Sequence, residues 1–482
     1  MNSSLSILSI FLIIIASGVS ASQTTTSAST SDRTKEIEID RYVEGEMRRY
    51  KIPGISLAVL RNGKISLLKS YGLANVELNI PVKPETIFQS GSIGKQFTAA
   101  AVMILVQEGK ISLDDKISKY LRNTPEAWKD ITIRSLLNHT SGLGDYPDEI
   151  NLRGDYTEDQ YLEIFKKAPL NFATGTKWDY SNVGYVTLGI LIGKLTGKSY
   201  GEFLQEKIFR PFGMSTTRVI SEEDIVPNRA AGYRLVNGEL KNQEWVSPST
   251  NSTADGSYYV SILDMAKWDA GLTAAGNSVL TPATLSEAWT PARLSSGLTK
   301  GYGFGWFTDT IHNRRVVFHG GAWQGFKSYI IRFLDEKLTI IFLANSWAAN
   351  DFKIARGLMT IFDPAFALKN QGKPLAARDP KADDLFRRVL MQLTNDKPDK
   401  DSFTAEAQEQ LFPTSTQRFG EVLRSLTLPV AVIHLSELIG RSDEGNLRVY
   451  TYQLVDIGQT LVCKMKLTKD DRIASLDVSK VW

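Results

Sequence analysis

The chain has 482 residues, of which 42% are hydrophobic and 23% are charged, and this composition is typical of a folded globular protein with room for two or more domains. Its 56 basic and 53 acidic residues give a formal net charge of only +3, and without a basic run or stripe the sequence argues against nucleic acid as a partner. A single cysteine, Cys463, excludes an intramolecular disulfide.

The first 21 residues differ from the rest in composition. An almost continuous apolar run from Leu5 to Ala16 is followed by small residues up to Ala21, which predicts a secretory signal peptide at 1–21 and an exported protein, periplasmic or extracellular. The run is too short to span a bilayer as a helix. Because residues 1–4 carry no Lys or Arg, an uncleaved anchor is the alternative. Residues 22–36, which begin with a Ser- and Thr-rich stretch, are expected to form a flexible leader.

Two strands and a helix are predicted next. Gly54 to Leu60 is strand-like, Asn62-Gly63 is a strong hairpin signal, and Lys64 to Tyr71 returns. A helical stretch from Ser92 to about Glu108 then carries apolar residues at helical spacing.

Ser92 and Lys95 lie at the start of this helical stretch. Residues three apart on a helix lie on the same face, one turn from each other, so an amine is placed beside a hydroxyl. A serine hydroxyl needs a neighbouring base to become a good nucleophile, and a buried lysine can be that base because burial disfavours its charged form. Alone, the pair also fits an ordinary solvated helix start.

Tyr180 and Asn182 form a second candidate group. Taken alone, Asn182 could cap the helix predicted from Val183 to about Lys194, with Gly197 just past its end.

His319, Gly320 and Gly321 form a third group, at the end of the strand-like segment Arg315 to Phe318. By itself this pattern most often marks a turn at an edge strand.

The order of elements predicts an α+β fold. Strand patterns return at Phe326 to Leu334 and Leu338 to Ala344, and Lys353 to Phe362 is predicted as a closing helix. Strands near both ends of residues 37–363, with helices between, predict one antiparallel sheet built from both chain ends and an inserted helical domain. The active site is expected in the cleft between the two.

Composition changes after residue 363. Residues 364–381 are predicted to be a linker, and residues 382–482 a small α+β domain similar to cystatin-like or NTF2-like appendages. Two helical zones come first, at Ala382 to Leu393 and Thr404 to Leu426. Four strands follow, predicted at Ala431 to Leu438, Leu447 to Val455, Thr460 to Leu467 and Ile473 to Val478.

The three groups, Ser-x-x-Lys, Tyr-x-Asn and His-x-Gly in this order, resemble the serine β-lactamase and penicillin-binding-protein superfamily. The middle group is similar to the class C branch, which also holds D,D-peptidases, D-aminopeptidases and esterases. Three further segments support the resemblance, which runs from about Ile37 to about Ile361: Leu136 to Leu143, Asp255 to Trp268, and Gly301 to Trp306.

The resemblance implies a role for each residue. Ser92 is the nucleophile that forms an acyl-enzyme, and Lys95 and Tyr180 share the proton transfers, in an order that the sequence leaves open. Asn182 orients Lys95 or the substrate amide. The oxyanion hole is formed by the backbone N–H groups of Ser92 and Ala322, and one such donor typically stabilises the transition state by ~3 kcal/mol.

The third group departs from the Lys-Thr-Gly of β-lactamases, in which Lys and Thr help to hold a substrate carboxylate. His319 replaces the lysine and is only partly charged near pH 7, and Gly320 replaces the threonine, whereas the final glycine is kept as Gly321. This departure favours small esters, amides or peptides as substrates of a carboxylesterase or D-amino-acid peptidase. A β-lactamase or D-alanyl-D-alanine carboxypeptidase is the alternative.

The sequence also leaves one alternative from another functional class. From another class, the chain could be a catalytically idle acyl-binding or sensor protein. The four histidines show no metal-ligand spacing, so we expect no metal and no cofactor, and His139 is expected to hold a loop beside the cleft. The expected partner is a small-molecule substrate, and the mature chain is expected to have no integral membrane span. The oligomeric state cannot be read from the sequence.

Overall fold

The computed structural model describes residues 30–274, 279–311, 313–363, 375, 379–395, 397–424, 437–456 and 459–481. The predicted signal peptide, most of the predicted leader and linker, His312 and His434 lie outside the described residues.

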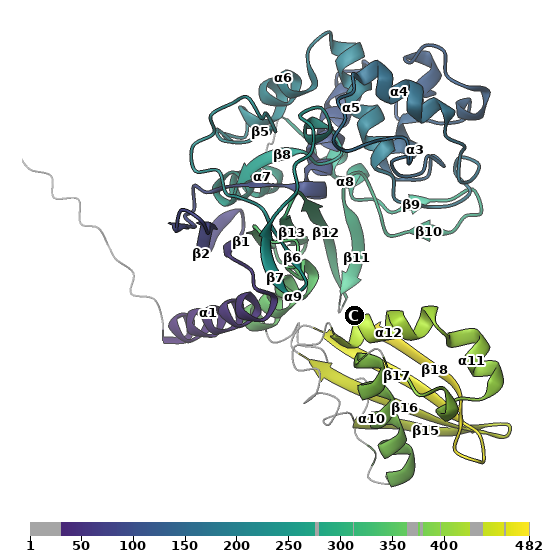
Figure 1. Cartoon of the computed structure of the whole chain (residues 1–482). Coiled ribbons are helices and arrows are strands. Elements are labelled where there is room, and N and C mark those ends of the chain that lie inside the picture. Colours follow the sequence, from purple (N-terminus) through teal and green to yellow (C-terminus); the bar gives the residue numbers. More distant parts are fainter. Residues whose placement is uncertain are drawn as a thin grey trace, which may run out of the picture.

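Strands from both ends of residues 37–363 form one seven-stranded antiparallel sheet, in the order β11-β12-β13-β14-β1-β2-β3 (Figure 1). The sheet predicted from both chain ends is thus confirmed, with strand β1 pairing β14 directly. The strands are β1 (Gly54–Arg61), β2 (Lys64–Asn75), β3 (Ile80–Pro81), β11 (Phe307–Ile311), β12 (Arg314–Trp323), β13 (Phe326–Phe333) and β14 (Leu338–Ala344).

Strand β1 in the middle of the sheet is buried on both faces. Successive side chains of a strand point to opposite sides. On one face Leu57 and Val59 of β1 join a core with helices α1 (Thr30–Tyr50) and α9 (Asp351–Phe362). On the other face Ala58 and Leu60 join the core of the helical region. A strand buried on both faces explains the continuous apolar run of β1.

The helical region is inserted between β3 and β11 (Figure 1). Its helix α2 is buried along most of its length, which fixes the start of that helix against the sheet. The helices are α2 (Lys95–Gln107), α3 (Ile133–Leu137), α4 (Glu158–Lys167), α5 (Asn182–Thr196), α6 (Tyr200–Leu204), α7 (Ile262–Thr273) and α8 (Pro282–Ala288), with short helical turns η1 (Gly91–Gly94), η2 (Ile117–Lys119), η3 (Glu126–Trp128), η4 (Gln205–Phe209) and η5 (Thr250–Ser252). Small strands complete it: β4 (Ile87–Gln89), β5 (Arg218–Val219), β6 (Tyr233–Val236), β7 (Glu239–Asn242), β8 (Tyr258–Ser261), β9 (Ala292–Arg293) and β10 (Thr299–Lys300).

The C-terminal region is a small α+β unit, as predicted. Its helices α10, α11 and α12 pack on the four-stranded antiparallel meander β15-β16-β17-β18, and its core draws only on residues 382–478. Cys463 is buried in this core. The bounds are α10 (Pro380–Thr394), η7 (Lys400–Ser402), α11 (Ala405–Leu411), α12 (Thr414–Arg424), β15 (Glu437–Glu444), β16 (Leu447–Asp456), β17 (Gln459–Leu467) and β18 (Ile473–Val481).

Two predictions for this region can be compared with the described residues. The helical zone predicted from Thr404 to Leu426 contains the two helices α11 and α12, and the described part of the first strand of the meander runs from Glu437 to Glu444. Residues 431–436 of the strand predicted at Ala431 to Leu438 lie outside the described residues.

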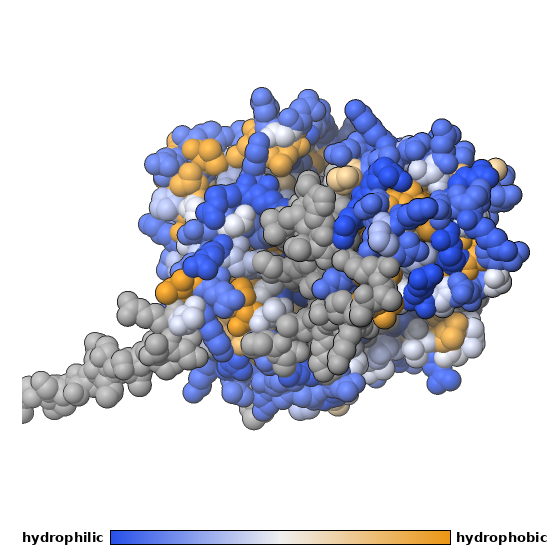
Figure 2. Space-filling view, turned by 90° about the horizontal axis from the view of Figure 1, so that it is seen from below, coloured by the Kyte–Doolittle hydropathy of each residue, from blue (hydrophilic) through white to orange (hydrophobic). Residues whose placement is uncertain are grey.

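Seen from below, apolar residues lie in separate groups among hydrophilic ones (Figure 2). A mixed surface of this kind is ordinary for a protein whose larger apolar side chains are mostly buried. Within the described ranges, no helix combines the length and the apolar character needed to cross a bilayer.

Candidate active site

Ser92 lies on the short helical turn η1, immediately before α2 begins at Lys95. The continuous helix predicted from Ser92 therefore starts one turn later than expected, and a single turn of 3₁₀ helix leads into it. The spacing still brings the two side chains together, with Lys95 Nζ 3.3 Å from Ser92 Oγ.

The turn that carries Ser92 packs closely against strand β12. Gly91 has a φ of +54°, and a Cβ added to it would lie only 2.4 Å from the backbone nitrogen of Ala322. Both the left-handed conformation and the close approach require glycine here. Gly321 is equally crowded, because a Cβ at that position would lie 2.2 Å from the carbonyl oxygen of Ser90.

The second half of β12, residues 319–323, lies at the site and forms a free edge of the sheet. Strand β11 pairs with β12 only from Arg314 to Phe318, whereas β13 continues the pairing to Trp323. His319 therefore lies in the middle of a strand, not at the turn that ends one. Because β11 stops at this point, no described strand pairs with residues 319–323 on that edge, and their backbone groups can face a bound substrate.

Lys95 is the centre of the polar contacts in the site. Its side chain is fully buried, and Nζ lies 2.6 Å from Asn182 Oδ1 and 2.5 Å from the carbonyl oxygen of Asp255. Nζ also lies 4.9 Å from the centre of the Tyr180 ring and 5.4 Å from that of Tyr185.

Burial lowers the pKa of Lys95 from 10.5 to about 8, although the nearby carboxylates of Asp255 and Asp145 oppose the change. Burial disfavours the charged ammonium, and the two carboxylates favour it. At pH 7 about a tenth of such an amine is neutral, so a base is available at physiological pH.

The Tyr180 hydroxyl is buried and makes no hydrogen bond of standard geometry to the described residues. Burial raises the pKa of Tyr180 well above 10, and the neighbouring Ser92 hydroxyl counters only part of that rise. Tyr180 therefore stays a phenol in the free protein, whereas Lys95 deprotonates far more readily.

Asn182 connects Lys95 to a carboxylate. Its Oδ1 accepts a hydrogen bond from Lys95, and its Nδ2 donates to Asp145 at 3.0 Å. The cap of α5 is a different residue from the one considered above: the Ser181 side chain accepts from the Gly184 backbone, and Asn182 is the first residue of the helix. Gly197 ends α5 in a left-handed conformation, as predicted.

His319 is buried beside Tyr302, with both ring nitrogens engaged. Nε2 lies 3.0 Å from the Tyr302 hydroxyl and Nδ1 lies 2.6 Å from the Gly320 carbonyl oxygen, so Tyr302 donates to Nε2 and Nδ1 donates to the carbonyl. Burial, helped by the charge of Lys95, lowers the pKa of His319 to about 3. The imidazole is thus neutral near pH 7, which corrects the expectation of partial charge.

Packing also explains why a glycine occupies position 320. A Cβ at this position would lie 2.6 Å from Oδ2 of Asp351, on the α9 side of the sheet. A threonine side chain at this position would therefore require the Asp351 carboxylate to move.

Sequence reasoning missed three residues at the site. Asp145 and the carbonyl of Asp255 hold Asn182 and Lys95, and Tyr302 holds His319. Asp255 and Tyr302 lay in segments that carry the family resemblance, but nothing in the sequence around Asp145 pointed to a role.

The site thus combines a half-buried hydroxyl, a buried amine with a lowered pKa, a phenol and a free strand edge. This arrangement can support attack of a serine on a carbonyl group. Among the described residues, no group of three His, Cys, Asp or Glu side chains converges as metal ligands do.

Known proteins are similar to this chain in sequence and in fold. The sequence profile of the family described as Beta-lactamase matches residues 39–360. Penicillin-binding protein 4* of Bacillus subtilis is 30% identical over 325 residues, covering 64% of this chain and 71% of that protein. A D-aminopeptidase of Gluconobacter oxydans is 29% identical over 311 residues, covering 62% of this chain and 57% of that protein. An octameric penicillin-binding protein homologue from Pyrococcus abyssi has a similar fold, with a TM-score of 0.62, 22% identity and coverage of 92% of this chain and 98% of that chain.

Proposed function

Because this chain belongs to the Beta-lactamase family and is a serine hydrolase of the esterase and peptidase type, we propose that it forms an acyl-enzyme on Ser92 and acts on small esters or on D-amino-acid amides and peptides. Ser92 attacks the substrate carbonyl, and water later releases the acyl group.

The observation that carries the proposal is the set of contacts around Lys95. A neutral amine has two hydrogens and one lone pair. Asn182 Oδ1 and the Asp255 carbonyl, at 2.6 and 2.5 Å, accept the two hydrogens. The lone pair is then left to face Ser92 Oγ at 3.3 Å, where it can take the serine proton. Lys95 is therefore the base for acylation. Tyr180, which is protonated in the free protein, can give its proton to the leaving group and recover the serine proton from the Lys95 ammonium, so that both groups end the step as they began it.

The oxyanion formed in this step needs backbone donors. We assign this role to the N–H groups of Ser92 and Ala322, in keeping with the close packing of Gly91 on Ala322 and with the free edge of β12. Donors fixed by packing stabilise a developing negative charge without having to reorganise.

The charges of the site favour substrates without a carboxylate next to the scissile bond. His319 is neutral, Gly320 has no hydroxyl, and Lys95 is held by Asn182 and Asp255. A buried carboxylate without a partner is costly, so a free C-terminal carboxylate gains nothing here.

A matched pair of peptides tests this choice of substrate. N-acetyl-D-alanyl-D-alanine and its C-terminal amide differ only in the carboxylate. We expect the amide to have a kcat/KM equal to or higher than that of the acid, and p-nitrophenyl acetate and D-alanine p-nitroanilide to be turned over faster than nitrocefin. Steady-state rates on purified protein give the comparison.

A preference for the free acid of about tenfold or more, worth roughly 1.4 kcal/mol, would contradict the proposed substrate class and favour a carboxypeptidase. A burst of acylation without steady-state turnover would instead identify the idle acyl-binding protein.

We further propose that residues 37–363 form the catalytic unit and that residues 382–482 are an appendage, joined by a linker at 364–381. The apolar cores support this division, since among the described residues one core draws on residues 382–478 and the others on residues 39–362. A protein ending at Asp363 is expected to fold and to keep its activity on p-nitrophenyl acetate within about threefold of the full chain, because domains with separate cores can fold alone. Thermal melting and an esterase assay of the soluble fraction measure both properties.

A soluble truncated protein that melts cooperatively but is inactive would mean that the C-terminal region contributes to the site. Aggregation without a soluble fraction would mean that this region covers apolar surface of the catalytic unit, and either result would overturn the division.

Export through a signal peptide at residues 1–21 belongs to the same proposal. It is supported by the composition of that segment, with its apolar run and the small residues that follow.

A further inference from the structure

His139 follows helix α3 and is buried beside Tyr180. Its side chain is only 1% exposed, and its φ of +61° is in the left-handed region, which few residues other than glycine and asparagine adopt readily. Its ring centre lies 4.4 Å from that of Tyr180 and 4.5 Å from that of Tyr302. The serine hydrolase chemistry proposed above gives this histidine no part.

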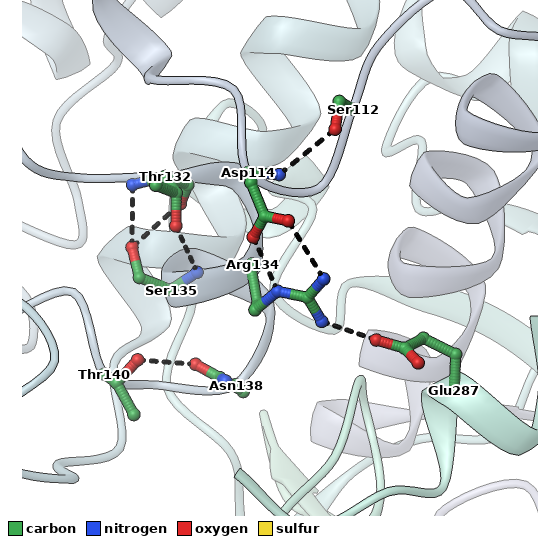
Figure 3. Close-up of polar contacts among 8 residues, drawn as sticks. All are labelled: Ser112, Asp114, Thr132, Arg134, Ser135, Asn138, Thr140 and Glu287. Carbon is green, nitrogen blue, oxygen red and sulfur yellow. Dashed lines mark hydrogen bonds and ion pairs between the residues drawn. The ribbon is translucent and has the colours of Figure 1, made fainter. Parts of the chain in front are cut away.

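Helix α3, which leads to His139, makes side-chain contacts at its start and with neighbouring segments (Figure 3). Thr132 and Ser135 form a capping box at the start of α3. Arg134 lies between two carboxylates, with Nε 2.8 Å from Asp114 Oδ1 and Nη1 2.5 Å from Glu287 Oε1. These contacts tie α3 to a preceding loop and to α8, so the segment that follows α3 is fixed in place.

The neighbours of His139 in the sequence stabilise the same loop. The Thr140 hydroxyl donates to Asn138 Oδ1 at 2.7 Å (Figure 3). The backbone N–H of Gly175 donates to the Thr140 carbonyl at 2.8 Å, which joins the loop to the segment that leads to Tyr180.

His139 itself holds the residues on both sides of Tyr180. Its carbonyl accepts a hydrogen bond from the backbone of Asp179 at 3.0 Å, and its Nδ1 accepts one from the backbone of Ser181 at 3.1 Å. His139 thus forms hydrogen bonds to the residues on either side of Tyr180, and its ring packs against the Tyr180 ring. A rotation or shift of His139 would move the phenol relative to Ser92.

These contacts require a neutral histidine. Nδ1 accepts a hydrogen bond from the backbone N–H of Ser181. In the neutral ring the proton is therefore on Nε2. A charged imidazolium would have a proton on Nδ1 as well and could not accept. Burial lowers the pKa of His139 well below 6.5, and the charge of Lys95 acts in the same direction. The ring is therefore an acceptor throughout the physiological range.

We propose that His139 is a positioning residue for Tyr180, which fixes the phenol beside Ser92 through the hydrogen bond from the Ser181 backbone to Nδ1 and through ring packing. The inference rests on the proposed role of Tyr180, and its effect is on catalysis rather than on substrate binding.

Two amide variants form a matched test. In His139→Asn the Oδ1 atom can take the place of Nδ1 as acceptor, and asparagine tolerates the left-handed backbone. In His139→Gln the amide lies one methylene further out and misses the Ser181 N–H. We expect kcat of His139→Gln to fall about tenfold or more, since small misplacements of a catalytic group are costly, whereas His139→Asn stays within about threefold of the parent and KM changes little in both.

A double-variant cycle with Tyr180→Phe separates positioning from general damage. If His139 acts through the Tyr180 hydroxyl, His139→Gln loses most of its effect once that hydroxyl is gone. A merely structural role would lower the melting temperature and reduce kcat by the same factor in both backgrounds.

The proposal is overturned if His139→Gln keeps full kcat, if His139→Asn loses as much as His139→Gln, or if the loss persists unchanged in the Tyr180→Phe background. Failure of the underlying function has a different signature, because Ser92→Ala would then keep its activity whatever residue occupies position 139.

Discussion

Replacing Ser92 with alanine is expected to abolish turnover of p-nitrophenyl esters and D-amino-acid amides, with kcat at least ~10⁴-fold lower. No other group can form the acyl-enzyme at this position, because Lys95 is held by two carbonyl oxygens and the Tyr180 hydroxyl stays protonated. Ser92 is half-buried, and the change removes a single oxygen atom, so the fold and melting temperature should be retained. Loss of labelling by a fluorophosphonate probe gives a second measure.

Ser296→Ala is the matched control. Ser296 is exposed on the loop between β9 and β10, and removing its hydroxyl should change neither turnover nor labelling. A Ser92→Ala protein that labels as strongly as the parent would show that another residue is the nucleophile.

The second large effect is expected at Lys95 and Tyr180. Lys95→Ala and Tyr180→Phe should each lower kcat by ~10² or more, because help from a general base or acid is typically worth 10²- to 10⁴-fold. The double variant should lose less than the product of the two, since both groups serve one proton transfer path. Steady-state kinetics of the four proteins give the coupling, and strictly multiplicative losses would mean that the two groups act independently.

The pH dependence identifies which of them is the base. The neutral amine is the active form, and burial lowers the pKa of Lys95 to about 8. The parent kcat/KM should therefore rise about tenfold per pH unit below pH 8 and level off above it. The rise of kcat/KM with pH below pH 8 should be absent from the Lys95→Ala protein. Tyr185→Phe is the control, because the Tyr185 hydroxyl donates to the Leu137 carbonyl, away from Ser92, and its profile should match that of the parent.

Much of the fold could be predicted because local and long-range preferences agree. The apolar run of β1 suits a strand buried on both faces, the Asn62-Gly63 turn defines the first hairpin, and the closing strands and α9 have equally clear patterns. The extension of the edge strand β15 beyond Leu438 was not predicted, for the opposite reason. Its residues from Arg441 to Glu444 are exposed and polar, so no apolar alternation marks this part of the strand, and its pairing with β16 determines it.

The site was predictable where chemistry depends on spacing along the chain. Ser92 and Lys95 are one turn apart and meet as expected. Asp145 could not be found this way, since it reaches the site through a contact with Asn182, 37 residues away. The cap of α5 was also ambiguous, because Ser181 and Asn182 are adjacent and equally suited to capping.

The charge of His319 depends on burial, which sequence does not reveal. Its position in a strand and the end of β11 beside it follow from strand register. Burial and strand register together explain why His319, Gly320 and Gly321 lie on a free strand edge and why the His319 imidazole is neutral.

The most direct test of the central claim is mass spectrometry of the protein quenched during turnover of p-nitrophenyl acetate. We predict one acyl group on the peptide that contains Ser92, formed at the rate of the pre-steady-state burst and absent from Ser92→Ala. Turnover with the acyl group on another residue, or undiminished turnover by Ser92→Ala, would contradict the account.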